Sequence, residues 1–481
     1  MHSGLAGLCV NIDHLFISVV YKDVRLWTVV AILAAAQLLR PKKTAFPVVN
    51  KYQGDFLNRR TYREVRENCR KLITEGLAKH QGGPITIAIP DNQKIVLQAS
   101  LAGWVKANKD LDHREVVKHD YFAGLPGFEA QAVLHGDDET PKRVIKTKLG
   151  QSDSTMATMN ASLARAFELI WGDSASWHAV NWYQDTAGII ARAASSVFVG
   201  PEKAGDAEWL ELVQGYVMSY CMAVGELHAY PAWARFIFLP NATNCRKLVP
   251  RARAIMNEVV QAASGDGSIK MGDLQLSLAM AALFTTSEMF RLILINLARH
   301  PDLAEPLRKE VSEQISTHGV SLVSLDSVMK ESQRLGSGLV VLERVALKDT
   351  ALPDGRIVPR GSHIMVDSTG LWDAAAYPNP DQFDGYRFLR KRETVDTSSQ
   401  FIQSGPDYHV FGGGRHICPG RFFAGNELNI ALAHILLKYD IRLAEGCDLK
   451  TIISSHYAMV DPTVQLEVRR RTDGAAAGVL L

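Results

Sequence analysis

The segment from Phe411 to Arg421 holds the residues whose types and spacing point most clearly to chemistry. Three consecutive glycines, Gly412–Gly414, allow a tight turn and a close approach of the backbone to another group. Cys418 directly precedes Pro419, and proline is favoured at the first position of a helix. The backbone N–H groups and the positive dipole end of a helix N-terminus lower a thiol's pKa and so produce thiolate. Because thiolate is the form of cysteine that binds a metal, the segment predicts a metal ligand at Cys418.

The loop resembles the haem-binding loop of the cytochrome P450 superfamily, in which Phe, Gly, a basic residue, Cys and Gly stand at set offsets. In this chain the residues at those offsets are Phe411, Gly414, His416, Cys418 and Gly420. A buried cysteine at an ordinary helix start is the plainer alternative, which the fixed offsets disfavour. The resemblance covers most of the chain, and the histidine followed by Cys-Pro-Gly-Arg-Phe-Phe resembles filamentous-fungal members from secondary metabolism. It implies that haem b is the cofactor and that Cys418 is the axial ligand of its iron, pushing electron density that favours O–O cleavage.

A Glu-x-x-Arg pair, Glu331 and Arg334, precedes this loop. At i and i+3 on a helix both side chains share one face, although such pairs are common on surface helices and add little there. The order of the motifs gives the pair weight, because Arg387 and then the cysteine loop follow it. The family resemblance implies that Glu331, Arg334 and Arg387 form a buried structural lock. The alternative is three solvated charges.

The stretch Ala281–Thr286 lies in a long apolar segment and is similar to the family's oxygen-binding segment. The resemblance implies that Thr285 hydrogen-bonds the iron-bound oxygen and helps to deliver protons. Phe284 stands where many members carry an acid, and phenylalanine cannot relay a proton. We therefore expect protons to arrive through water, Thr286 or another group, unless the chemistry differs. The alternative is that both threonines bond only to helix carbonyls.

Haem carries two propionates, which need cationic or hydrogen-bonding partners. The resemblance implies His416 as one partner, and Arg344 is the next candidate. The family often adds a Trp and a basic residue from an early helix. Here that helix is Pro141–Leu149, which lacks Trp; Lys146 or Lys148 is its weak candidate, and a solvated lysine is the plainer reading of either.

The resemblance implies that small, apolar residues line the distal side of the substrate pocket, which suits a hydrophobic ligand. The predicted pocket residues are Ala281, Ala282, Ser337 and Leu339. The stretch Val116–Gly127 is expected to form a variable lid over this pocket. Its Tyr121 and Phe122 line the pocket in one interpretation and fill core in the other.

Composition is that of a folded globular protein, since 47% of the 481 residues are hydrophobic and 22% are charged. Basic residues number 53 and acidic residues 51, so no general electrostatic attraction to nucleic acid is expected. The six cysteines include no CxxC pair, which disfavours a disulfide scaffold or a zinc ribbon.

The elements that must position the motifs are mainly helical. The pattern predicts helices over Thr61–Lys79, Gly272–His300, Ser324–Leu335 and Pro419–Tyr439, and a hairpin of Ile85–Ile89 with Ile95–Leu97. Gly272–His300 is apolar on all sides, so it should cross the interior. The predicted class is mainly α with small β-sheets, and the resemblance implies one large cytochrome P450 fold. Haem would then lie between the long central helix and the cysteine loop with its last helix.

Residues 1–45 are expected to form an anchor or interfacial helix with its connector, and residues 46–481 the haem-thiolate catalytic domain. The apolar run Leu26–Leu39 would span roughly 21 Å as a helix, less than the ~30 Å of a hydrocarbon core. Spanning the membrane and lying at its surface therefore stay open. The fungal resemblance implies attachment to the endoplasmic reticulum membrane with the catalytic domain facing the cytosol.

The function that the resemblance implies is a monooxygenase, which inserts one oxygen atom of O2 into a hydrophobic small molecule of terpenoid, indole-terpenoid or polyketide type. No glycine-rich nucleotide fingerprint occurs at a strand–helix junction, so a separate NADPH-dependent flavoprotein reductase is expected to supply electrons. The alternatives are a haem-thiolate isomerase or dehydratase, which Phe284 favours, a non-catalytic haem-binding protein, and a helical protein without haem.

Overall fold

The computed structural model describes residues 45–55, 58–89, 92–149, 152–228, 235, 243–262, 271–317, 322–336, 342–394, 399–405, 408–447, 451–454 and 457–472. The described elements belong to the unit Phe46–Leu481. The apolar run Leu26–Leu39 and the predicted pocket residues Ser337 and Leu339 lie outside the described residues.

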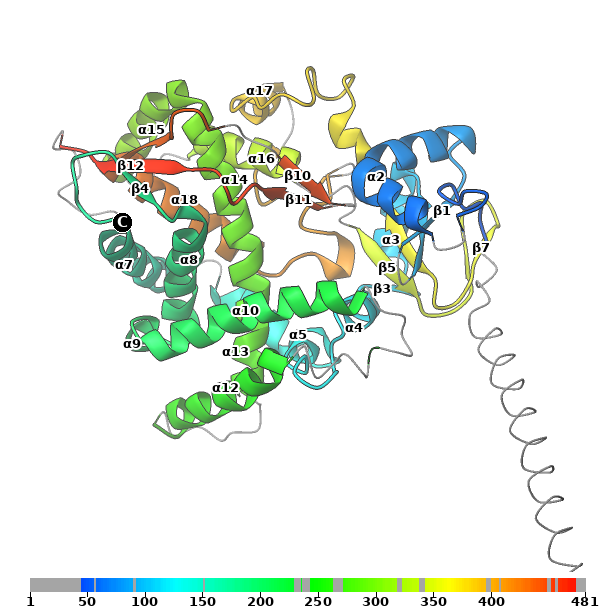
Figure 1. The fold of residues 1–481 in the computed structure, drawn as a ribbon, viewed down its shortest axis with the longest axis horizontal. Helices are drawn as coiled ribbons and strands as arrows, with labels where there is room; N and C mark the ends of the chain where they lie inside the picture. The colour runs from blue at the N-terminus through cyan, green and yellow to red at the C-terminus, as the bar shows by residue number, and fades with distance from the viewer. Residues whose placement is uncertain are drawn as a thin grey trace, which may run out of the picture. The chain divides into compact units, whose positions relative to one another are not determined.

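Helices dominate this unit, as the sequence predicts (Figure 1). Besides the central helix, the helices are α2 (Arg59–Lys79), α3 (Ala102–Ala107), α4 (Arg114–Asp120), α5 (Gln131–His135), α6 (Thr140–Val144), α7 (Asp153–Ile170), α8 (Trp182–Phe198), α9 (Pro201–Ala204), α10 (Ala207–His228), α12 (Thr243–Ala262), α15 (Ala304–Thr317), α16 (Val323–Gly336), α17 (Arg387–Thr394) and α18 (Arg421–Lys438). The predicted helix Thr61–Lys79 is α2, whose buried Val65, Cys69, Ile73 and Leu77 recur every fourth residue. Such spacing places apolar side chains on one face of a helix and so explains why α2 packs on the core.

The predicted central helix runs from Met271 to Arg299 and contains a π-helical turn. Its parts are α13 (Met271–Ala279), the π-helical segment Met280–Phe284 and α14 (Thr285–Arg299). It is long and apolar enough to cross a membrane, but 61% of its apolar 18-residue stretch is buried inside the protein. It is therefore a core helix, as its all-round apolarity predicts. Single π-helical turns are rare and frequently mark functional sites.

The described residues also form four small sheets. A five-stranded sheet has the order β1-β2-β8-β5-β3, and the others pair β4-β12-β9, β10-β11 and β6-β7. Their strands are β1 (Ile85–Ala88), β2 (Gln93–Leu97), β3 (Leu111–Asp112), β4 (His178–Val180), β5 (Glu343–Ala346), β6 (Thr350–Ala351), β7 (Ile357–Val358), β8 (His363–Val366), β9 (Tyr439–Leu443), β10 (Thr451–Ser454), β11 (Tyr457–Val460) and β12 (Leu466–Arg470). The predicted hairpin is confirmed, since β1 and β2 pair antiparallel with Ile85 opposite Val96.

The largest hydrophobic core lies where α7, α8, α14 and α18 contact one another. Figure 1 shows α14 crossing this helical part with α18 and α8 beside it. The ring of Phe198 on α8 stacks on that of Phe423 on α18 at a centroid distance of 5.1 Å. The start of α18 is thereby fixed against the core, and this start follows directly on the cysteine loop.

Candidate active site

The glycine run bends the cysteine loop back on itself. Gly412 and Gly414 have positive φ angles of 71° and 63°, which other residues adopt only with strain. A Cβ atom on Gly414 would stand 2.3 Å from the carbonyl oxygen of Lys106, so helix α3 packs directly on the glycine backbone. The Cys418 N–H donates to the carbonyl oxygen of Phe411 at 2.9 Å and closes the loop. The sequence therefore forms a tight hairpin-like cradle with the thiol at its end.

Two expectations about the thiol need correction. Helix α18 begins at Arg421 rather than at Pro419, so Cys418 lies one short turn before the helix. Burial raises the pKa of the Cys418 thiol, although the N–H groups of Gly420 and Arg421 and the charge of Arg421 oppose that shift. The helix start thus favours thiolate, as predicted, but burial outweighs it in the protein alone. A positively charged metal centre is what stabilises a buried thiolate.

Gly420 has a φ of −88°, and a Cβ there would meet only Ile145 Cγ2 at 3.9 Å, an ordinary van der Waals distance. The protein's own atoms therefore do not require glycine at this position. Phe411 is half-buried, with its ring against that of Phe401 at 5.5 Å and 89°. Its ring supports the loop from the side of the core.

Arg344, at the start of β5, is buried and lies against the loop. Its Nη2 donates to the carbonyl oxygen of Gly413 at 3.0 Å and its Nη1 to the carbonyl oxygen of Glu343 at 2.7 Å. Only 2% of its surface is exposed, and this burial lowers its pKa to about 10, so it remains cationic at neutral pH. Among the described residues this guanidinium donates to carbonyl oxygens, and a buried guanidinium with such partners is suited to an additional anionic partner.

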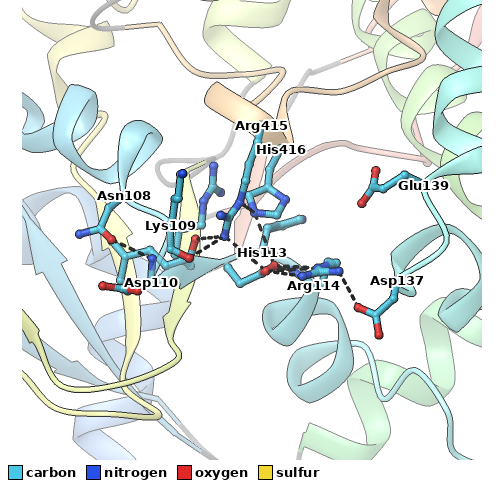
Figure 2. Close-up of polar contacts among 12 residues, drawn as sticks. Asn108, Lys109, Asp110, His113, Arg114, Asp137, Glu139, Arg415 and His416 are labelled. Carbon is cyan, nitrogen blue, oxygen red and sulfur yellow. Dashed lines mark hydrogen bonds and ion pairs between the residues drawn. The ribbon is translucent and has the colours of Figure 1, made fainter.

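Arg415 and His416 lie over the segment that leads into α4, as Figure 2 shows. Arg415 Nη2 donates to the carbonyl oxygens of Lys109 and Leu111 at 3.0 and 3.1 Å, and its Nε donates to His416 Nε2 at 2.9 Å. Because His416 Nε2 accepts that hydrogen bond, the proton of the neutral imidazole is assigned to Nδ1. Burial, and then the charge of Arg344, lowers the pKa of His416 to about 3.

Asp112 is the buried carboxylate of this cluster. Burial raises its pKa, but hydrogen bonds from Arg114 outweigh that effect and lower the pKa to about 2. It also lies 3.4 Å from both Arg415 Nη2 and His416 Nε2. One carboxylate is therefore shared between Arg114 and Arg415, with the imidazole of His416 beside it.

His113 adds a further imidazole that the sequence analysis did not identify. Its ring lies 6.2 Å from that of His416, and its Nδ1 lies 3.3 Å from the carbonyl oxygen of Glu343. Burial, and then the charge of Arg344, lowers its pKa. No sequence signal marks it, because only the fold brings residue 113 beside residues 344 and 416. Lys146 and Lys148, the weak candidates, are exposed side chains.

The residues fit haem b in two respects. Cys418 supplies a single thiolate at the end of a glycine cradle, as an axial iron ligand requires. Arg344 supplies a buried cation and His416 an Nδ1–H donor, which suits two propionates. Arg344 and His416 were predicted for this role, and the fold places the His113 ring beside His416.

The predicted lock residues meet in a buried network. Arg334 Nε and Nη2 donate to the two carboxylate oxygens of Glu331 at 2.8 Å each, and Arg387 Nε donates to Glu331 Oε1 at 3.0 Å. Glu331 and Arg334 are fully buried, and Arg387 is 5% exposed. Arg334 also donates to the carbonyl oxygen of Leu371 and Arg387 to that of Pro378, both at 2.7 Å. The network therefore ties α16 to the two segments that precede the cysteine loop.

Lys330 provides a second link from α16 to this region, which the sequence analysis missed. Its ammonium group donates to the carbonyl oxygens of Gln400 and Gln403 at 2.7 and 2.8 Å and lies 4.0 Å from the centre of the Tyr408 ring. Only 1% of Lys330 is exposed. The chain entering the cysteine loop is thus fixed to the same helix that carries the lock.

One face of the central helix is exposed in and directly after the π-helical segment. Ala281, Phe284 and Thr285 are exposed, whereas Leu283 and Thr286 are buried. The Thr285 hydroxyl donates to the carbonyl oxygen of Ala281 at 2.7 Å, the bond expected for a threonine in a helix. Ala282 is half-buried against the core. The predicted pocket residue Ala281 and the predicted catalytic residue Thr285 therefore share an open face, and Thr286 does not.

The predicted lid contains α4 and the turn after it. Phe122 is buried, with its ring 5.0 Å from that of His228 and 6.3 Å from that of Phe128, so it fills core rather than lining a pocket. Tyr121 is half-buried, and its carbonyl oxygen accepts a hydrogen bond from Tyr220. The lid is thus packed on α10.

Comparison with known proteins identifies a matching family model and related chains. The family model described as Cytochrome P450 matches residues 254–468. The chain is 32% identical over 479 residues to the cytochrome P450 monooxygenase hepE of Aspergillus oryzae, covering 90% of this chain and 87% of that protein. It is 30% identical to the cytochrome P450 monooxygenase eqxH of Fusarium heterosporum, covering 89% and 91% of the two chains.

A solved structure shows the same fold. The crystal structure of the cytochrome P450DA heme domain aligns with a TM-score of 0.66 and 16% sequence identity, covering 89% of this chain and 98% of that one. The predicted fold class, mainly α with small sheets, is therefore confirmed. The extended similarity to these monooxygenases, together with the matching family model, shows that the chain belongs to the cytochrome P450 family.

Proposed function

We propose that this chain is a haem-dependent monooxygenase that inserts one oxygen atom of O2 into a hydrophobic small molecule. The observation that carries the proposal is the closed Cys418 loop, packed through Gly413 on the buried cation Arg344. Bound haem supplies the activation of O2 and of an unreactive C–H or C=C bond. The protein's part is to hold the group, orient the substrate and manage protons.

Each part of the site has a distinct task in this proposal. Cys418 provides the thiolate, while Arg344 and His416 hold the propionates, with the His113 ring packed beside His416. Glu331 and Lys330 lie on α16, and their bonds fix the position of the cysteine loop relative to the core. The small side chain of Ala281 leaves room on the distal face, and the Thr285 hydroxyl beside it holds and passes a proton there.

Electrons come from outside the chain in this proposal, through an NADPH-dependent flavoprotein reductase. The relatives hepE and eqxH are named monooxygenases, which supports this use of a reductant. A terpenoid, indole-terpenoid or polyketide substrate of fungal secondary metabolism is the class we propose, in a protein attached to the endoplasmic reticulum membrane. The apolar run Leu26–Leu39 supports that attachment.

Phe284 favours one second candidate, a haem-thiolate isomerase or dehydratase that needs no electrons. Its side chain is 39% exposed on the open face of the helix, beside Thr285, where an acid would otherwise stand. Such an enzyme rearranges an oxygenated substrate without O2.

The two candidates separate in one experiment with the full-length holoprotein. Terpenoids, indole-terpenoids and polyketides that displace the haem Soret band are incubated under isotopically labelled O2, with and without NADPH and a fungal reductase. A product that carries one labelled oxygen atom, formed only with both additions, supports the monooxygenase. Conversion that needs neither addition and takes up no label would contradict it and support the isomerase.

A further inference from the structure

We propose that Glu288 is the residue through which protons reach the distal face, acting through the Thr285 hydroxyl. This role rests on the monooxygenase function proposed above. Insertion of oxygen consumes R–H, O2, two electrons and two protons and yields R–OH and water. Two protons must therefore travel from solvent into the interior for each product formed, and Phe284 cannot carry them.

The central helix has few ionisable groups that could do so. Between Asp273 and Arg299 its ionisable acid or base side chains are Glu288 and Arg291. Glu288 stands three residues after Thr285 and four after Phe284, and both spacings place side chains next to each other on a helix surface. Glu288 therefore follows Phe284 and Thr285 by one turn of the helix, and its side chain, 15% exposed, reaches Tyr183 on α8.

Among the described residues, only one of the two carboxylate oxygens of Glu288 has hydrogen-bond partners. Its Oε1 accepts a hydrogen bond from the Tyr183 hydroxyl at 3.2 Å and pairs with Arg291. Its Oε2 is buried and has no hydrogen-bond partner among the described residues. A buried acceptor without a partner is destabilising, so an ion pair with a purely structural role would be expected to engage both oxygens. Oε2 is the atom that can take up and release a proton.

The remaining contacts hold Glu288 in place and link it to the surface. Arg291 donates to the Thr186 hydroxyl at 3.0 Å and to the carbonyl oxygen of Tyr183, and its guanidinium lies 3.7 Å from the centre of the Tyr183 ring. Tyr183 is half-buried in the first turn of α8, and the neighbouring Gln184 is exposed. The cluster thus extends from the open face of the central helix to the exposed start of α8.

Cys221 on α10 and Tyr183 are titratable groups near Glu288, and the Cys221 thiol keeps its own proton at neutral pH. Burial, and then the charge of Glu288, raises the pKa of the Cys221 thiol to about 11. Burial and the charge of Glu288 likewise raise the pKa of Tyr183. Both groups remain neutral, so neither takes up the proton in place of Glu288, which lies beside the guanidinium of Arg291.

The transfer leaves the protein unchanged after each turnover. A proton from solvent binds Glu288 Oε2 and then passes through water to Thr285 Oγ1, whose own hydrogen is directed at the Ala281 carbonyl and whose lone pairs can accept. Thr285 would then pass a proton to the distal side, where O2 is reduced, and Glu288, again a carboxylate, would take the next proton from solvent. The electrons come from the flavoprotein reductase, and both protons end in the water that leaves.

The test uses Glu288→Gln in the full-length holoprotein, with Glu288→Asp as the conservative variant. Glu305→Gln is the matched control, because Glu305 also pairs with an arginine three residues on, Arg308, but on the surface. No organic substrate is needed: NADPH and a fungal reductase drive O2 consumption, measured in H2O and in D2O. A second measurement follows reductase-driven formation of the ferrous carbon monoxide complex, which needs electrons but no protons.

If Glu288 relays protons, Glu288→Gln slows O2 consumption at least tenfold and raises its solvent isotope effect. The carbon monoxide complex still forms at the wild-type rate, Glu288→Asp retains much of the activity, and Glu305→Gln behaves as wild type. The proposal would be overturned if Glu288→Gln consumed O2 at the wild-type rate with the wild-type isotope effect. It would also be overturned if formation of the carbon monoxide complex slowed as much as O2 consumption, which marks a structural role. A wild-type protein that forms the complex but consumes no O2 would instead overturn the monooxygenase function on which this role depends.

Discussion

Arg344 and Gly413 are joined by a hydrogen bond of 3.0 Å that connects strand β5 to the cysteine loop across 69 residues of sequence. Three features converge at this bond. The glycine run allows the loop to approach, the sheet brings the guanidinium there, and burial of the guanidinium makes an anionic partner favourable. The bond explains how one end of a small sheet takes part in binding the cofactor.

Arg344→Gln is therefore expected to bind haem more weakly while the chain still folds. A hydrogen bond to a charged group contributes about 1.5–3 kcal/mol, which corresponds to roughly 10- to 150-fold in haem affinity. Haem content per chain and the rate of haem transfer to a haem-scavenging protein measure the effect. Arg344→Lys keeps the charge but not the forked geometry, so its haem affinity should lie between those of the wild type and of Arg344→Gln. Unchanged haem transfer in Arg344→Gln would remove this residue from the propionate site.

Glu331→Gln should destabilise the whole fold. The substitution leaves Arg334 and Arg387 buried without their shared carboxylate, and breaking a buried ion network costs about 3–5 kcal/mol. The free energy of unfolding from denaturant titration is the measurement. Glu305→Gln, at a pair with a carboxylate that is 80% exposed, should change it by less than about 1 kcal/mol. Equal effects of the two substitutions would show that the network is not a lock.

Thr285→Ala should keep haem and its spectrum but release more hydrogen peroxide per NADPH consumed. The reason is that the exposed hydroxyl on the open face would no longer pass protons to oxygen. Thr285→Ser keeps the hydroxyl and should retain coupling. Thr286→Val is the matched control, since Thr286 is 3% exposed and faces away. Peroxide yields that do not differ between Thr285→Ala and Thr286→Val would contradict the role given to Thr285.

Stability should fall on acidification, and His434 should account for part of the fall. Burial, and then the charge of Lys438, lowers the pKa of His434 to about 3, while its Nε2 lies 2.8 Å from Asn160 Oδ1. The folded protein thus keeps it neutral, whereas the unfolded chain protonates below about pH 6.5. The free energy of unfolding then decreases as pH falls from about 6.5 toward 3, by up to ~1.4 kcal/mol per pH unit for this group.

Denaturant titrations from about pH 7 down to about pH 4 check this prediction. His434→Gln retains an amide donor toward Asn160 but cannot titrate, so its stability should depend less steeply on pH than that of the wild type. Parallel curves for the two proteins would show that His434 does not contribute.

The sequence predicts most of what local pattern controls. The helices α2, α14 and α16 and the β1–β2 hairpin follow from apolar periodicity, and the lock residues follow from the order of the motifs. The start of α18 was placed two residues early because proline is permitted, but not required, at a first helical position.

What the sequence does not show depends on contacts between distant segments. His113 joins the propionate site, and Lys330 anchors the chain before the cysteine loop, only because the sheet and α16 bring them there. The π-helical turn at Met280–Phe284 also has no clear pattern in the sequence. Thr285 and Thr286 are adjacent in α14 and lie on different faces of it, and which of the two is exposed depends on how the fold packs around the helix.

The central claim is that Cys418 binds haem iron as a thiolate, and the spectrum of the reduced protein with and without carbon monoxide tests it most directly. The full-length protein, produced with haem supplied, should give the strongly red-shifted Soret band of thiolate-bound ferrous haem. Cys418→Ala should lose that band while the chain still folds. A wild-type band typical of histidine or thiol ligation, or the same band in both proteins, would contradict the assignment of Cys418.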